Sequence, residues 1–320
     1  MPAKLATTEN LRRAMVEQKQ LRDISEMKAK FDHLTTNACV IDQPTLDSLG
    51  VVLGQPLDID DSGSFWGSDT RFFQPWVPDE LLDEAASNRA PWSWKDKIRE
   101  TWYKQPESKY GELKAQWFNG CLEDLYEMDK ELWEPWVVDS YTIREHSGLD
   151  LPLCRFRIFD PATDDFVERE YSPEAVYFPV DRTKPHVACF AIDSNHPPGD
   201  KVLRSDLHYA IQLVRFRLEK GQHTGHHTKP GLIYTIERDQ WARITQVHFD
   251  TNAHKLVLRQ SRQLDLCGPT PPPDAFLLLR WMTSRPAGDT EYVDEEEPPK
   301  EEVARDEPSS AAPKLLLGCA

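Results

Sequence analysis

Three histidines, His223, His226 and His227, lie within five residues and are interrupted by Thr224 and Gly225. Neutral imidazole nitrogens are common ligands of Zn²⁺ and of other transition metals, and a glycine lets the chain bend around an ion. The same residues also fit a polar turn in which the imidazoles form hydrogen bonds with backbone carbonyls. We favour the polar turn and keep a Zn or Fe site as the alternative, so no cofactor is assigned.

A metal site at these histidines would need further ligands, because adjacent histidines rarely point at one ion. No residue follows them at the fixed spacing of known zinc sites. The candidates for these further ligands are Asp193, Asp206 and His208.

A second group of chemically active residues is basic. Residues 204–266 contain ten Lys or Arg against six Asp or Glu, although the whole chain carries a formal net charge of −16. Arg243, Gln246, Arg259 and Arg262 fall on or just after neighbouring predicted strands, where they could bind a phosphate, a carboxylate or an acidic partner. Alternating polar residues are equally typical of the solvent-exposed face of a half-buried sheet, and we favour that interpretation.

An acidic loop at residues 58–69 approaches the calcium-loop pattern, with Asp58, Asp60 and Gly63 at suitable spacing. Its last position is Asp69 instead of the longer glutamate, and glycines and prolines flank it where helices should lie. We therefore expect a solvated acidic loop. The sequence contains no glycine-rich phosphate loop, nucleophile elbow, HExxH or kinase motif.

The elements that position these residues follow from apolar periodicity. Residues 232–236, 241–249 and 256–264 predict three strands of an antiparallel meander, joined at 238–240 and at 250–254.

Before the meander, residues 154–159 and 166–171 predict a β-hairpin, and 187–192 predicts a central strand. Ser205 and Asp206 are expected to cap a helix that ends at Gly221, although its alternation also fits a strand. Asp274 is expected to cap a short helix over 275–283.

The first part of the chain is predicted to be helical. Leu21, Ile24, Met27, Phe31 and Leu34 form one stripe of a helix over 8–34, which we expect to dock on its own domain rather than to oligomerise. Residues 36–78 are predicted to form a loop. The tryptophan-rich block 79–136 predicts small helices, including one over 91–102, with the Trp rings filling the seams between them.

Composition limits the class of protein. Hydrophobic residues make up 39% of the chain and there are 10 Trp, which argues against a disordered protein. The net charge argues against general binding of nucleic acid or of an anionic membrane, and no apolar stretch reaches membrane length. Six scattered cysteines without a CxxC pair favour reduced thiols in the cytosol or the nucleus.

We therefore predict an α+β fold with an amphipathic helix at 1–35 and one globular domain at 36–286, helical over 79–136 and sheet-rich over 137–286. Residues 287–320 are predicted to form a disordered acidic tail. This tail is expected to screen the basic strip formed by Arg243, Gln246, Arg259 and Arg262. The predicted function is that of a binding or accessory protein for a protein or small anionic ligand. The alternative is a metal-dependent hydrolase that uses the histidine cluster.

Overall fold

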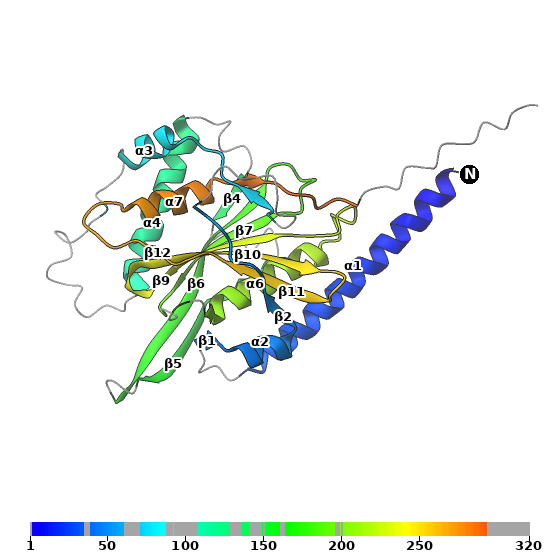
Figure 1. The fold of residues 1–320 in the computed structure, drawn as a ribbon, viewed down its shortest axis with the longest axis horizontal. Helices are drawn as coiled ribbons and strands as arrows, with labels where there is room; N and C mark the ends of the chain where they lie inside the picture. Colours follow the sequence, from blue (N-terminus) through cyan, green and yellow to red (C-terminus); the bar gives the residue numbers. More distant parts are fainter. Residues whose placement is uncertain are drawn as a thin grey trace, which may run out of the picture.

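The computed structural model describes residues 2–34, 39–60, 71–87, 92, 108–128, 136–140, 149, 151–160, 164–195, 199 and 201–292. Within these residues a large mixed sheet lies at the centre, and helices cover both of its faces (Figure 1). The predicted α+β class is confirmed. The predicted helix over 91–102 and the chain after Tyr292 lie outside the described residues.

Six α-helices are present in the described part of the chain. They are α1 (Pro2–Asp32), α2 (Gln43–Leu49), α3 (Asp79–Ser87), α4 (Ser108–Met128), α6 (Arg204–Glu219) and α7 (Pro273–Met282), with a 3₁₀ turn η2 (Arg238–Gln240). All the helices predicted in described regions are present.

The strands of the main sheet include the predicted hairpin, the central strand and the meander. They are β2 (Val51–Leu53), β4 (Trp136–Ser140), β5 (Cys154–Asp160), β6 (Asp165–Pro179), β7 (Val187–Asp193), β9 (Gly231–Glu237), β10 (Trp241–Asp250), β11 (Lys255–Gln260) and β12 (Leu264–Asp265). The strand order is β2-β11-β10-β9-β7-β6-β4, with β5 paired to β6 and β12 to β10.

Two antiparallel units meet in the middle of this sheet. Strands β5, β6 and β7 form one, and β9, β10 and β11 form the other. Helix α6 connects β7 to β9, which are parallel neighbours. Because a parallel pair needs a crossover, α6 must lie across one face of the sheet.

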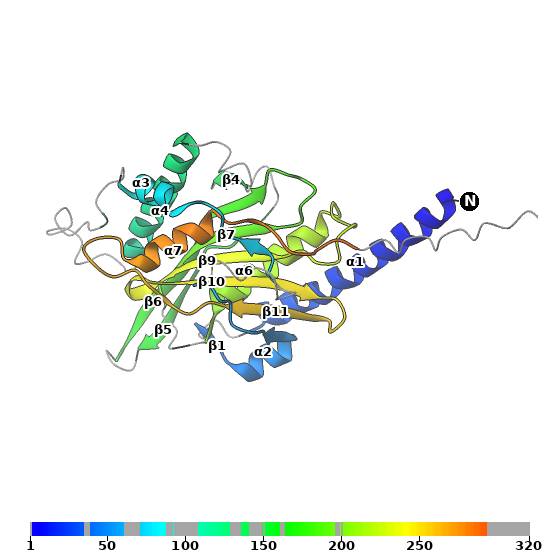
Figure 2. The same ribbon diagram turned by 45° about the horizontal axis from the view of Figure 1, so that its top comes forward.

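Each face of the sheet has its own apolar core. Helices α3, α4 and α7 cover one face, and α1, α2 and α6 cover the other (Figure 2). The side chains of β7 alternate between the two cores, so Phe190 packs in the first and Cys189 in the second. Trp117 of α4 is buried in the first core, and its ring centroid lies 4.7 Å from that of Trp92.

Helix α1 docks through the predicted stripe. Ile24, Met27 and Phe31 are buried in the second core. The N-terminal part of this helix continues past the body of the molecule (Figure 1).

The structure also corrects several predictions. Strand β10 is buried along both faces, so the expected solvent-exposed face of the meander is wrong for this strand. Residues 36–78 contain α2 and β2, together with β1 (Val40–Ile41) and β3 (Phe73–Gln74), which pair with β8 (Val202–Leu203) and β13 (Arg285–Pro286).

The expected caps of α6 and α7 are also wrong. Leu203 and Pro272 occupy the N-cap positions, and neither helix has a side-chain cap. Ser205 and Asp206 instead bind side chains of the sheet, and Asp274 binds Arg262. None of the helices in the described ranges combines the length and apolar composition that a membrane crossing requires.

Candidate functional site

The four residues predicted to bind an anion are divided between the two faces of the sheet. Gln246 and Arg259 are direct partners across β10 and β11. Both face the side of α7, where Gln246 Oε1 accepts a hydrogen bond from the Phe72 amide at 3.1 Å. Arg243 is an odd number of residues from Gln246, so it points to the opposite face, under α6.

Arg243 connects segments of the protein rather than facing solvent. Its Nη1 and Nη2 donate to the carbonyls of Lys201 and Gly199 at 2.9 and 2.8 Å, and its Nε lies 3.3 Å from Glu237 Oε1. The residue is only 1% exposed.

Arg259 and Arg262 also make internal contacts. Arg259 Nε donates to Gln55 O at 2.9 Å. Arg262 binds both carboxylate oxygens of Asp60 and of Asp274, and these hydrogen bonds raise its pKa. The four residues thus form no continuous strip, and anion binding by them stays a prediction.

Under the first turn of α6 lies a buried acid network that begins with Asp193, the last residue of β7. Its Oδ1 accepts from the Asn195 amide at 2.8 Å, and its Oδ2 accepts from Ser205 Oγ at 2.5 Å. Burial raises the pKa of Asp193 to about 7.

Two more carboxyl groups complete this acid network. Asp206 Oδ1 accepts from Thr235 Oγ1 at 2.7 Å, and burial raises the pKa of Asp206. Glu237 ends β9, and burial raises its pKa to about 8 although the guanidinium of Arg243 acts in the opposite direction. Desolvation penalises each charged carboxylate, so all three carboxyl groups hold a proton more tightly than they would in water.

The acid network lies at the carboxyl ends of two parallel strands, where ligands bind in many open α/β sheets. Here the three carboxyl groups are no more than 2% exposed. The hydrogen bonds of Ser205 with Asp193 and of Asp206 with Thr235 hold α6 to the sheet. Sequence reasoning overlooked Glu237, although an acidic residue directly after the apolar run 231–236 was a usable signal.

The histidine cluster lies at the other end of α6. This helix has 16 residues, which corresponds to about 24 Å. The candidate additional ligands Asp193, Asp206 and His208 are at or near its N-terminal end, whereas His223 follows its C-terminal end. The structure therefore does not bring these candidates to the histidines.

The three predicted ligands have different surroundings. The ring centroids of His223 and His226 are 6.0 Å apart. His226 Nδ1 contacts Thr290 Oγ1 at 2.9 Å, whereas His227 Nδ1 contacts Thr228 Oγ1 at 2.8 Å. In the described residues, no group of three or more His, Cys, Asp or Glu is placed to hold a metal ion.

A segment before the end of the described chain crosses this cluster; we call residues 285–292 the strap. The His227 amide donates to Thr290 O at 2.8 Å, and the Tyr292 amide donates to Gly225 O at 3.0 Å. Gly288 has a φ of +76°, and a Cβ there would lie 2.5 Å from Arg71 O, so only glycine fits. The ordered contacts of the chain thus continue into the predicted tail.

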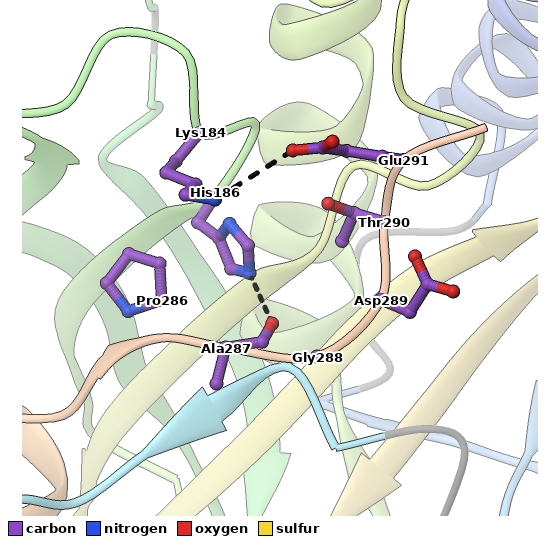
Figure 3. A pocket seen from close by; sticks show the side chains of 8 residues that line it. All are labelled: Lys184, His186, Pro286, Ala287, Gly288, Asp289, Thr290 and Glu291. Atoms are coloured by element: carbon purple, nitrogen blue, oxygen red, sulfur yellow. Dashed lines mark hydrogen bonds and ion pairs between the residues drawn. The ribbon is translucent and has the colours of Figure 1, made fainter. Parts of the chain in front are cut away.

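The ring of His186 anchors the strap by a contact with Ala287 (Figure 3). Its Nε2 donates to Ala287 O at 3.0 Å, and burial lowers its pKa to about 3. Around this ring lies a cavity of about 120 Å³, whose rim includes Lys184 and Glu291. Their charged groups are 3.9 Å apart.

Burial also lowers the pKa of the three clustered histidines, to about 4 for His223. These imidazoles are therefore neutral at pH 7. Neutral rings packed against the strap fit the favoured polar turn. Both contacts are made with Thr290, by the backbone amide of His227 and by the ring of His226. Metal binding stays a prediction.

The most exposed large apolar side chains of α1 form a surface that sequence reasoning did not identify. We call Leu11, Arg12, Met15, Gln18, Lys19 and Arg22 the outer face of α1. Leu11 and Met15 are 63% and 64% exposed. Leu11, Met15, Gln18 and Arg22 recur at helical spacing on the side opposite the buried stripe.

The sequence signal that could have revealed this surface is the pair Leu11 and Met15, which are four residues apart and lie outside the buried stripe of the same helix. Comparison with known proteins does not assign the surface or the buried clusters, because no family model, curated protein or solved structure matches the chain.

Proposed function

We propose that this chain is a binding protein that docks an acidic, leucine-containing segment of a partner protein on the outer face of α1. The observation that carries the proposal is the pair Leu11 and Met15, exposed on a helix that continues past the body (Figure 1). Covering two large apolar side chains contributes roughly 1.5–3 kcal/mol for each one that becomes fully buried.

The charge of this surface selects the partner. Arg12, Lys19 and Arg22 belong to the exposed positions of residues 8–22, where Arg12 lies 3.6 Å from the partly exposed Glu9 and Lys19 contacts His254, so the basic residues outnumber the acidic one. An acidic segment complements these cations, which favours encounter and excludes basic competitors. The proposal keeps the acidic partner predicted from the sequence and moves its site from the sheet to the helix.

The helix is also held firmly enough to act as a docking element. Glu17 and Lys229 form a buried ion pair at 3.1 Å, and Gln20 Nε2 donates to Thr251 Oγ1 at 2.5 Å. A preorganised helix loses less conformational entropy when a partner binds.

The test uses the full chain and a fluorescent peptide of two Leu-Glu-Glu-Leu-Leu-Glu-Glu heptads. We expect the double variant Leu11→Gln and Met15→Gln to weaken binding at least about tenfold, because glutamine keeps the helix but removes the apolar contact. The matched control, Leu153→Gln with Phe166→Gln, removes two exposed apolar side chains elsewhere and should bind like the wild type. Equal affinity of the α1 variant and the wild type would overturn the proposal.

Measuring the metal content of the purified protein tests the alternative, a metal-dependent hydrolase. Stoichiometric Zn or Fe that is lost in His226→Ala would favour the enzyme. The five described cysteines carry free thiols, and we place the binding protein in the cytosol or the nucleus.

A further inference from the structure

We propose that the acidic C-terminal tail of the same chain, residues 293–320, occupies the outer face of α1 and competes with the partner. The inference rests on the proposed function for the identity of the surface, and it adds the regulation of that surface.

The tail begins beside α1. Tyr292, the last described residue, is held in place by a hydrogen bond that its backbone amide donates to Gly225 O at 3.0 Å. Its ring lies 5.7 Å from the ring of His227 and 4.9 Å from the guanidinium carbon of Arg13 on α1. The residue before the acidic tail therefore lies beside Arg13, and Arg13 is the neighbour in sequence of Arg12 on the outer face.

The tail is long enough to reach this surface. Its first acidic run, Asp294–Glu297, ends five residues after Tyr292. Five extended residues span about 17 Å, more than the roughly 10–12 Å diameter of a helix with its side chains. The run can thus pass from the body side of α1 to Arg12, and Leu315–Leu317 have ample chain to reach Leu11 and Met15.

The chemistry of the tail matches the docking surface. Residues 293–320 contain eight acidic and three basic residues and end in the apolar group Leu315–Leu317. A single exposed ion pair contributes only about 0–1 kcal/mol, so several contacts must act together. Tethering helps, because a short linker gives the tail a local concentration in the millimolar range. Salt should weaken the contact, since it shortens the Debye length.

The first experiment measures oxidation of Met15 by dilute hydrogen peroxide, followed by mass spectrometry. The tail variant of the full chain carries four substitutions: Asp294→Asn, Glu295→Gln, Glu296→Gln and Glu297→Gln. Peroxide should oxidise Met15 at least about threefold faster in this variant than in the wild type, because its uncovered thioether is accessible. Buried Met27, 4% exposed, is the internal control and should not change. The same rate for Met15 in both proteins would overturn the inference.

The second experiment separates the two proposals. The tail variant should bind the acidic heptad peptide at least about threefold more tightly than the wild type, and a second variant, Leu315→Gln with Leu316→Gln and Leu317→Gln, should do the same. Equal binding by wild type and tail variants removes the tail inference alone, provided that binding still depends on Leu11 and Met15. If binding by the tail variants does not depend on Leu11 and Met15, the proposed function fails, and the Met15 oxidation rates still decide the tail inference.

Discussion

The two ends of helix α6 bury titratable groups of opposite kinds. At the N-terminal end are Asp193, Asp206 and Glu237, whose pKa values are raised; at the C-terminal end are His186 and the histidine cluster, whose pKa values are lowered. The physical cause is the same, because burial penalises whichever form is charged. One helix is thus held at both ends by groups that prefer to be neutral.

The difference lies in the pH at which each end loses stability. A carboxyl group with a raised pKa binds more protons in the folded state, so the free energy of unfolding falls as the pH rises from about 4 through about 8. A histidine with a lowered pKa binds fewer protons in the folded state, so stability falls as the pH drops from about 6.5 through about 3. The two ranges overlap between about pH 4 and pH 6.5, so the protein should be most stable within this overlap.

Replacing Arg243 should have the largest effect on this comparison. The variant Arg243→Met leaves Glu237 and its neighbouring carboxyl groups buried without the guanidinium, which should cost roughly 3–5 kcal/mol of unfolding free energy at pH 8. The cost should shrink at pH 5, which lies below the raised pKa values of Asp193 and Glu237. Urea unfolding at the two pH values measures both quantities.

The control for this variant is Arg157→Met, because Arg157 pairs with Glu168 on the surface, where both side chains are more than 70% exposed. Its loss should be within about 1 kcal/mol at either pH. A cost for Arg243→Met that is the same at pH 5 and pH 8 would show that packing, not charge, dominates at the acid end.

The next effect in size concerns Glu237 itself. Glutamine imitates the protonated acid, so Glu237→Gln should flatten the decline in unfolding free energy between about pH 4.5 and pH 8. Each unit of pKa shift corresponds to about 1.4 kcal/mol, so the change should amount to a few kcal/mol. The same measurement on exposed Glu168→Gln should leave the slope of the wild type unchanged. If the unfolding free energy of Glu237→Gln falls with rising pH as steeply as that of the wild type, groups other than Glu237 cause the decline.

Sequence reasoning found much of this fold and little of its buried chemistry. The meander, the hairpin and α6 follow from local periodicity, which the sheet and its two cores preserve. The caps failed because Ser205 and Asp206 find partners on strands that are far away in the sequence.

The same reason explains the basic strip. The prediction grouped Arg243 with Gln246, although the two are an odd number of residues apart and lie on opposite faces, and it did not foresee that helices cover both faces. Arg243 therefore became an internal link to Glu237. The strap over His186 was out of reach too, because it joins residues about a hundred positions apart.

The histidine end gives the third prediction. Glutamine at position 186 can still donate a hydrogen bond to Ala287 O but does not take up a proton near neutral pH. His186→Gln should therefore lose less stability than the wild type between pH 6.5 and pH 4, by about 1.4 kcal/mol for each unit of pKa shift that the substitution removes. Thermal unfolding at several pH values tests this, with exposed His33→Gln as the control. Identical acid sensitivity in His186→Gln and wild type would locate the acid response elsewhere.

The smallest effect should come from the strap. Thr290→Val keeps the shape of the side chain but removes the contact with His226 Nδ1, which should cost about 0.5–1.5 kcal/mol. Because the strap makes local contacts, this loss should appear as local opening rather than as global unfolding. Hydrogen exchange of the amides of His227 and Tyr292, which bond across the strap, should accelerate up to about tenfold. Thr45→Val, which removes a hydrogen bond with Asp42 at the start of α2, should leave both amides unchanged. If the exchange of these amides in Thr290→Val equals that of the wild type, the backbone hydrogen bonds hold the strap without His226. The two ends of α6 then differ in construction as well as in the pH at which they lose stability.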